Sequence, residues 1–392
     1  MKYCRTGLSR DTITLMLVSL SVILIRCGDE DTSPTNSTNP GDTIAADTLL
    51  TVSPLSIDSV TGFVPLGNLN PSGHVFPTDH CYMYLPTDPG AYRSHVVTLY
   101  CPGNLRLTEI NAFEHVGANI TDYRIGFELQ SGVTLEFSHA SSLEQSVFGD
   151  VTGFAGFTLL QEYTTGGETY RMWRKPADTV LSAGTILGTA GGNPRQGALD
   201  IGVYDTRVTH ATAAAAGTWT NSNYLHAVCP LEYYAPGAVK ESLYAIMQRD
   251  TVHGDNYPCG WIAQDVAGTA QGIWFNPDSP RPYPEDPHLA LVWHNQEAAR
   301  QVISMGTSVH ALPAGTYKFT PVTDGALNRR FDQIEPDGQV HGYHLMDHHD
   351  LLLKTAIVQM TDATTLRFDA LVGHISDSSL WIFTDSAMTF TR

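Results

Sequence analysis

The stretch Asp122–His139, DYRIGFELQSGVTLEFSH, decides the fold class of this chain. Polar and apolar side chains alternate along Asp122–Leu129 and again along Val133–His139. Alternation with a period of two is typical of a strand with one buried face, and Ser131-Gly132 between the two runs is a tight-turn pair. The stretch therefore predicts an antiparallel β-hairpin.

Short runs of the same kind continue along most of the chain. With 34 glycines and 22 prolines, the composition favours many turns and a β-rich fold over helical bundles. One helix is predicted at Ala238–Met247, where apolar residues recur at helical spacing. The fold class is therefore all-β. The further predicted strands are His95–Tyr100, Tyr170–Arg174, Thr185–Leu187, Ala198–Tyr204, Gly272–Phe275, Leu289–Trp293, Gln301–Ser304, Gly315–Thr320, Lys354–Gln359, Thr365–Ala370 and Leu380–Phe383.

Length and charge limit the classes of function. A chain of 392 residues is long enough for two domains, with one or three as the alternatives, and 42% hydrophobic content is ordinary for a globular protein with a buried core. The formal net charge is -18, and no run of Lys or Arg stands out. Because a phosphate backbone would be repelled, no nucleic-acid partner is expected.

The N-terminus, residues 1–27, resembles a bacterial lipoprotein signal. Basic residues precede a mostly apolar run, Ile13–Ile25, which is shorter than the roughly 20 residues of a membrane span. Cys27 follows, with Leu24 at the usual upstream position and Arg26 where a small residue is usual. The resemblance implies export and membrane anchoring through a lipid on Cys27, at the periplasmic or cell surface. The alternative is an ordinary secretory signal or an uncleaved anchor.

The polar residues after Cys27 predict a flexible tether over residues 28–58, because such a segment cannot bury enough apolar surface to become ordered. Export also permits disulfides among the four cysteines of the body. Pairing of Cys81 with Cys101 and of Cys229 with Cys259 is the simplest of three connectivities.

The stretch Leu66–Tyr84, LGNLNPSGHVFPTDHCYMY, carries polar groups of chemical interest. It places His74, Asp79 and His80 on a turn shaped by prolines and glycine, directly before an apolar run that predicts a strand. Imidazole and carboxylate groups at a strand edge suit a metal site or an acid–base site. The alternative is an ordinary turn whose histidines are satisfied by hydrogen bonds.

Together with two later segments, this stretch resembles the lysostaphin-like (M23) zinc peptidase domain. The segments are Gly132–Leu143, GVTLEFSHASSL, and Ala183–Val203, AGTILGTAGGNPRQGALDIGV. The family has an early H-x-x-x-D pair, a strand ending in Y-x-H-L-S, a G-x-x-I-G-x-x-G turn and then an H-x-H strand. The resemblance covers residues 59–208 and implies an antiparallel duplicated hybrid motif there.

The sequence departs from the family pattern at two points. Four residues rather than three separate His74 from Asp79, and Ala198-Leu199-Asp200 stands where the family has H-x-H. Residues i and i+2 of a strand share a face, so Asp200 can still face the site, whereas Ala198 has no group for acid–base catalysis.

The resemblance implies metal ligands among His74, His80, Asp79 and Asp200, with His139 as the catalytic residue beside them. Such a set suits zinc, or calcium or manganese where carboxylates and water dominate. The loss of H-x-H favours a degenerate domain that binds peptidoglycan, a peptide or another cell-envelope polymer. The alternative is an active metal-dependent hydrolase, an M23-type peptidase with altered ligands.

Residues 209–259 are predicted to connect this domain, through a short helix, to a second all-β domain at 260–392, a barrel or a sandwich. Its histidine-rich segment His341–Asp350, HGYHLMDHHD, is either a metal-binding tract or a loop of solvated histidines. Trp274 is either a sugar-stacking platform or a core residue.

Overall fold

The hairpin that the alternating stretch predicts is present in the computed structural model. Strand β5 (Ile120–Gln130) pairs antiparallel with β6 (Val133–Leu143). Gly132 in the turn has a φ of 79°, a conformation that glycine adopts without strain. The alternate side chains that point inward are fully buried, and they are Ile125, Phe127, Leu135 and Phe137.

The structure describes residues 49–165, 168–194, 196–211, 223–250, 259–279, 282, 284–309, 312–347, 349 and 351–392, and all of them fall within one compact unit of the chain. The predicted signal, Cys27 and most of the predicted tether lie outside these residues. The last part of the tether is packed, because Leu50 and Leu55 are fully buried. No helix among the described residues is long and apolar enough to cross a membrane.

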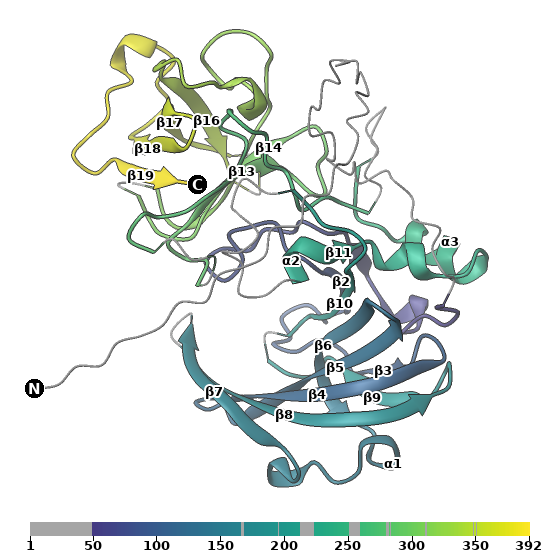
Figure 1. The fold of residues 1–392 in the computed structure, drawn as a ribbon. Helices are drawn as coiled ribbons and strands as arrows, with labels where there is room; N and C mark the ends of the chain where they lie inside the picture. The colour runs from purple at the N-terminus through teal and green to yellow at the C-terminus, as the bar shows by residue number, and fades with distance from the viewer. Residues whose placement is uncertain are drawn as a thin grey trace, which may run out of the picture. The chain divides into compact units, whose positions relative to one another are not determined.

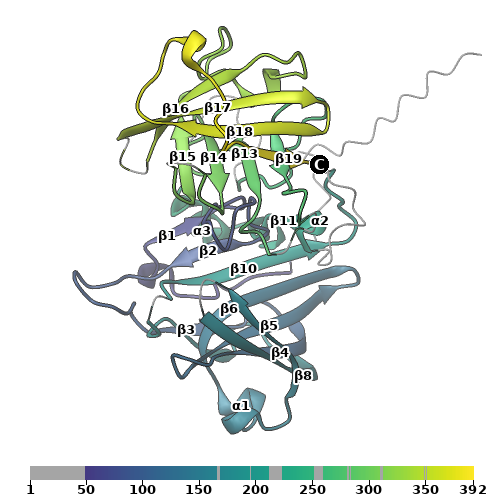
Figure 2. The ribbon, with the colours of Figure 1, turned by 90° about the vertical axis from the view of Figure 1, so that its left-hand side faces the viewer.

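The first sheet contains eleven strands in the described part of the chain (Figure 1). Its main path runs β1 (Gly62–Val64), β2 (Cys81–Tyr84), β10 (Ala198–Asp205), β6, β5, β4 (Leu105–His115), β8 (Glu168–Leu181) and β7 (Thr158–Thr165). Off this path, β11 (Ala227–Val228) pairs with β10, β9 (Ile186–Ala190) with β6, and β3 (Val97–Tyr100) with β9. The long strands β4, β5, β6 and β8 form the broad part of the sheet, and β10 joins them to β2 (Figure 2).

The second sheet contains eight strands, each paired antiparallel with the next. They are β12 (Gly272–Trp274), β13 (Leu289–Trp293), β14 (Gln301–Met305), β15 (Gly315–Phe319), β16 (His341–Met346), β17 (Leu352–Asp362), β18 (Thr365–Leu371) and β19 (Met388–Thr391). One isolated bridge, Phe275 with Thr391, links the two ends, but the described strands form no closed barrel. The all-β class is confirmed, whereas a barrel is not formed.

Helices are few and short in the described residues. The predicted helix is present as α3 (Ala238–Ala245), beside α1 (Gln145–Phe148) and α2 (Asn223–His226). The 3₁₀ turns are η1 (Ile57–Ser59), η2 (Thr152–Phe154), η4 (Pro230–Tyr233), η5 (Phe331–Gln333) and η6 (Ser378–Leu380). The predicted strand Leu380–Phe383 is wrong. There Asp377 caps the turn η6 by accepting from the Ser379 amide at 2.9 Å, and the last strand forms later, as β19.

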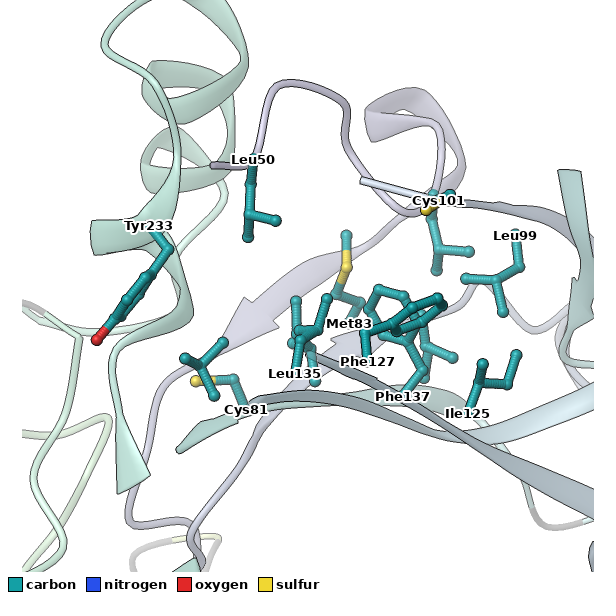
Figure 3. Close-up of a cluster of buried hydrophobic side chains, with 14 of the residues drawn as sticks. Leu50, Cys81, Met83, Leu99, Cys101, Ile125, Phe127, Leu135, Phe137 and Tyr233 are labelled. Carbon is teal, nitrogen blue, oxygen red and sulfur yellow. The ribbon is translucent and has the colours of Figure 1, made fainter. Parts of the chain in front are cut away.

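Each sheet has its own apolar core. Figure 3 shows the first, where Phe127 and Phe137 from the hairpin meet Met83 of β2. Trp274 belongs to the second core, is fully buried, and donates its indole N–H to the Ala270 carbonyl at 2.9 Å. Of the two interpretations of Trp274, the core residue is therefore the one that the structure supports.

The cysteine pairing was half right. Cys229 and Cys259 form a disulfide. Cys81 and Cys101 do not, although both are buried in the first core. Cys81 begins β2, which pairs with β1 and β10, whereas Cys101 follows β3, which pairs with β9. The two cysteines therefore belong to strands that are not neighbours, and the Cys101 thiol donates to the Gly103 carbonyl at 3.2 Å instead.

Candidate functional site

Strand β10 brings together residues that lie far apart in the sequence. Its Asp200 is opposite Tyr82 of β2 on one side and opposite Ser138 of β6 on the other. His80 directly precedes β2, and His139 directly follows Ser138. The histidines of the two flanking strands therefore reach the carboxylate of the central strand.

The backbone of β6 changes course at His139. Up to Ser138 the strand pairs with β10, and from Ala140 it pairs with β9. His139 has a φ of 68°, in the left-handed region, and the pairing of β6 with β5 is irregular at the same point. Irregularities of this kind redirect a side chain, and here the imidazole is directed towards Asp200.

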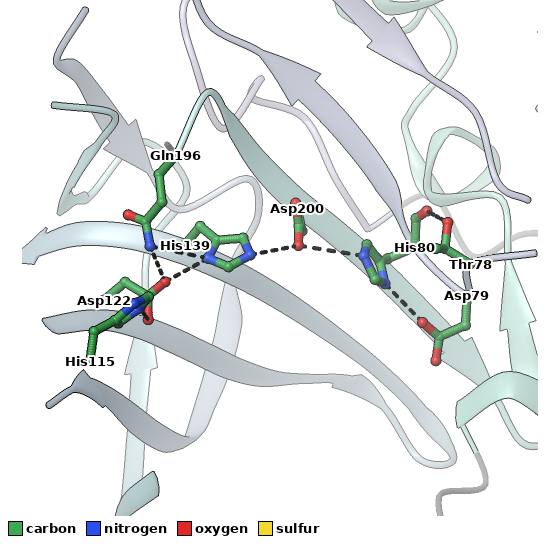
Figure 4. A network of polar contacts seen from close by, with 8 residues as sticks. All are labelled: Thr78, Asp79, His80, His115, Asp122, His139, Gln196 and Asp200. Carbon is green, nitrogen blue, oxygen red and sulfur yellow. Dashed lines mark hydrogen bonds and ion pairs between the residues drawn. The ribbon is translucent and has the colours of Figure 1, made fainter. Parts of the chain in front are cut away.

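The Asp200 carboxylate lies between two imidazoles, within ion-pair distance of both (Figure 4). Its Oδ2 lies 3.4 Å from His80 Nε2 and 3.3 Å from His139 Nε2. The opposite ring nitrogen of each histidine is held by a second carboxylate. Asp79 Oδ1 lies 2.8 Å from His80 Nδ1, and Asp122 Oδ2 lies 2.5 Å from His139 Nδ1. The result is an alternating chain of three carboxylates and two imidazoles, here called the histidine–carboxylate chain.

Polar side chains continue this chain at the Asp122 end. The Gln196 amide donates to Asp122 Oδ2, and His115 Nε2 lies 3.7 Å from Asp122 Oδ1. Asp122 is almost completely buried on β5. Its carboxylate therefore has partners for both oxygens inside the protein, which fixes the orientation of His139.

The electrostatics favour the charged form of the two imidazoles of the chain. The charges of Asp200 and Asp122 outweigh the effect of burial and raise the pKa of His139 to about 10. Asp200 and Asp79 likewise raise the pKa of His80 against its burial. Burial would raise the pKa of Asp122, but the neighbouring imidazoles of His115 and His139 hold it down, at about 2. Burial, together with the charges of Asp122 and Asp79, raises the pKa of the central Asp200, while the charges of His139 and His80 oppose that rise. Basic imidazoles thus alternate with carboxyl groups, and each has a group of opposite charge type beside it.

His74 lies close to the chain but is electrostatically different. Its ring centroid is 5.6 Å from that of His80, with the rings edge to face. Burial, and then the nearby charge of His80, lower the pKa of His74 to about 4. His74 is therefore neutral at physiological pH and lines a cavity, while His80 takes part in the chain.

That cavity has a volume of about 220 Å³. The turn before β2 contributes His74, Pro77, Thr78, Asp79 and His80, and the sheet contributes Arg124, Glu136, Ser138 and Tyr204. Asn223 and Tyr224 of α2 and Glu285, from the loop between β12 and β13, complete the lining. Residues of the first sheet therefore meet a loop that connects two strands of the second sheet at this cavity.

The turn before β2 is fastened to the second sheet. Phe76 packs in a cluster with residues of β12 and β13, and its ring stacks on His288 with the centroids 5.4 Å apart. The backbone N–H of Phe76 donates to Glu285 Oε2 at 2.9 Å. Glu285 is only 8% exposed, and burial raises its pKa to about 8.

The structure gathers four of the five predicted site residues into one chain of contacts: Asp79, His80, Asp200 and His139. His74 lies beside them. The predicted metal ligands do not converge, because Asp200 lies between the two imidazoles and Asp79 binds the far nitrogen of His80. No three His, Cys, Asp or Glu side chains of the described residues are arranged to hold a metal ion. As placed, these residues do not fit a zinc ion.

The second cluster of interest, His341–Asp350, is divided between β16 and a turn. His341 is buried, His344 packs beside His374 with ring centroids 4.8 Å apart, and His348 and Asp350 lie outside the described residues.

Comparison of the chain with protein-family models, with curated proteins and with solved structures finds no match. The resemblance to the M23 domain and to a lipoprotein signal therefore rests on the sequence motifs alone.

Proposed function

We propose that this protein is an exported lipoprotein, anchored through Cys27, that binds a peptide or polymer of the cell envelope without hydrolysing it. The proposed binding site is the cavity beside the histidine–carboxylate chain. The domain around it is, in this proposal, a degenerate relative of the M23 peptidases.

The observation that carries this proposal is the shared carboxylate of Asp200. Its Oδ2 has an imidazole on each side, within 3.4 Å, so the positive charges that balance it come from the protein itself. Ala198, two residues earlier on the same face of β10, brings no acid–base group. An internally neutralised chain that stiffens the wall of a polar cavity suits recognition better than catalysis.

The cavity supports binding by its chemistry. Its lining combines carboxylates, a guanidinium, hydroxyl groups and aromatic rings, which is the mixture that fixes the orientation of a polar ligand. Its volume of about 220 Å³ is below the roughly 300 Å³ at which sites for drug-sized ligands begin, and it therefore suits one residue of a longer chain.

The test is a pull-down with insoluble peptidoglycan and other envelope polymers, using the full chain in detergent. Binding should persist in excess chelator, and no soluble fragments should be released. Release of fragments that depends on added metal would overturn the proposal. Failure to bind any polymer of a broad panel would also overturn it.

A metal-dependent hydrolase is the second candidate, and one observation favours it. In each imidazole of the chain one carboxylate, Asp79 or Asp122, holds Nδ1, and Nε2 points away from that carboxylate towards Asp200. A carboxylate on the second ring nitrogen is usual for histidines that bind metals. Under this alternative, purified protein should hold about one metal ion per chain and be stabilised by it. Metal-free protein whose thermal unfolding is unchanged by zinc would exclude it.

The anchor has its own test. The variant Cys27→Ser should move the protein from the membrane fraction to the soluble fraction, because in this proposal the lipid on Cys27 supplies the membrane affinity. An unchanged distribution between the two fractions would refute lipidation of Cys27.

A further inference from the structure

The three carboxylates in the cavity differ in how their charge is balanced. Asp79 is paired with His80 at 2.8 Å, and Glu136 lies 3.5 Å from a guanidinium nitrogen of Arg124. Glu285 forms no ion pair with any residue that the structure describes, and its contact in the cavity wall is with a backbone amide, the N–H of Phe76. It is the acidic group of the cavity that has no described cation within ion-pair distance, although the charge of His80 acts on it from farther away.

The cations nearby are already engaged. Arg124 lies between Glu136 and Glu109, at 3.5 and 3.6 Å, and His80 lies between Asp79 and Asp200. A buried carboxyl group with no cation is costly when ionised, and this is the physical reason for the raised pKa of Glu285. A cation that entered the cavity would reverse this cost.

We propose that the cavity binds an alkylammonium group of a peptide, with Glu285 as its counter-ion. This inference rests on the proposed function and names the group that is recognised. Tyr204 and Tyr224 line the same cavity, and aromatic rings favour a neighbouring cation over an anion. The net charge of -18 adds a general attraction for cationic ligands.

An ammonium group can come from a lysine-type side chain or from a free peptide N-terminus. The two sources are separated with three probes: N-acetyl-lysine amide, alanine amide with its free α-amine, and N-acetyl-norleucine amide. The last is similar in length to the lysine probe but carries no charge. Isothermal titration calorimetry with the full chain in detergent measures all three.

The expected result is that at least one ammonium probe binds about tenfold or more tightly than the norleucine probe, and the tighter of the two identifies the source. The variant Glu285→Gln should remove this preference. Glutamine keeps a carbonyl oxygen that can accept from the Phe76 amide, so a purely structural role of Glu285 would leave binding unchanged. The matched control is Glu335→Gln, which makes the same change of residue type at an exposed position. This variant should bind like the native protein.

Two further measurements keep the test decisive. Thermal unfolding shows whether Glu285→Gln is folded. The variant Glu285→Asp keeps the carboxyl group but shortens the side chain by one methylene. It should bind the ammonium probe more weakly than the native protein does, yet still prefer that probe to the norleucine probe. Equal binding of all probes, or full binding by a folded Glu285→Gln, overturns the inference. If the protein nevertheless binds an envelope polymer, and the lysine probe does not compete, the proposed function stands while the ammonium site is refuted.

Discussion

Burial of Glu285 makes the stability of the protein depend on pH in a defined direction. Its pKa is raised from the ordinary 4.5 to about 8, first because of desolvation, while the amides of Phe76 and Val75 oppose the rise. The folded state therefore holds a proton that the unfolded state loses above pH 4.5. This contribution to the free energy of unfolding is intact below about pH 4.5 and is lost progressively as pH rises towards about 8.

The size of the effect follows from the two pKa values. The difference between 8 and 4.5 is 3.5, which at about 1.4 kcal/mol for each tenfold change in proton affinity gives an upper value of about 5 kcal/mol. Relaxation around the ionised group reduces it, so we expect about 2–5 kcal/mol. The variant Glu285→Gln cannot ionise, and it should lack this loss of stability.

The assay is urea unfolding of the native protein and of Glu285→Gln, followed by tryptophan fluorescence at about pH 5 and about pH 9. The other titrating groups are the same in both proteins. The quantity to compare is therefore the difference in free energy of unfolding between variant and native protein, at the lower and at the higher pH. The variant should gain on the native protein by about 2–5 kcal/mol as pH rises. An unchanged difference would refute the buried, cation-free state of Glu285. Glu335→Gln, at an exposed position, should show no such gain.

Three further outcomes are expected. Asp200→Asn should lower the pKa of His139 from about 10 towards its ordinary value, as measured by NMR titration of the ring protons. Because 43% of the His139 side chain is exposed to solvent, the fall in its pKa should be limited. An unchanged pKa would contradict the contact between Asp200 and His139. Replacement of Cys229 and Cys259 by serine should lower the free energy of unfolding by about 3–4 kcal/mol in denaturant, from the sequence separation of 30 residues between the bonded cysteines. Arg392→Ala should cost about 2–4 kcal/mol in thermal unfolding, because its buried guanidinium stacks 4.1 Å above the Trp274 ring; a loss below 1 kcal/mol would exclude a structural role.

Local patterns were sufficient to predict the fold class. The alternation in β5 and β6 is a property of neighbouring residues, and it predicted both strands and the turn between them. The segment Leu380–Phe383 was wrongly predicted to be a strand, because its apolar residues belong to a turn and the irregular segment after it. Trp381, for example, donates its indole N–H to the Ile375 carbonyl at 2.8 Å. Short apolar runs do not distinguish these two cases.

The site was predictable where strand geometry determines it. Asp200 faces the histidines because β10 pairs with β2 and β6, and the alternation of side chains along a strand predicts that positions 198 and 200 share a face. Asp122 was missed as a site residue, although the hairpin turn was predicted. A two-residue turn sets the register of β5 against β6, and Tyr123 is opposite Ala140. That register alone places Asp122 near the end of β6 that carries His139.

Glu285 could not be found from local sequence. Its hydrogen bond joins residues that are 209 positions apart, and no periodicity connects a loop of the second sheet with a turn before β2. The signal exists only in three dimensions, where one carboxyl group of a polar cavity has no cation among the described residues. Burial and charge balance, rather than motif, reveal it.

The chemistry of β10 depends on two things, the position of a side chain in the sheet and its residue type. The sheet fixes where the side chain at position 200 lies, between two imidazoles whose far nitrogens are held by Asp79 and Asp122. The residue type then fixes the sign of the charge at that point. A neutral imidazole there would leave electron pairs for a metal ion, whereas a carboxylate attracts protons onto His80 and His139 and is neutralised by them. One residue on a fixed strand thereby decides whether the two imidazoles face a neutral or an acidic partner, and here Asp200 joins them into an alternating chain beside the cavity that Glu285 lines.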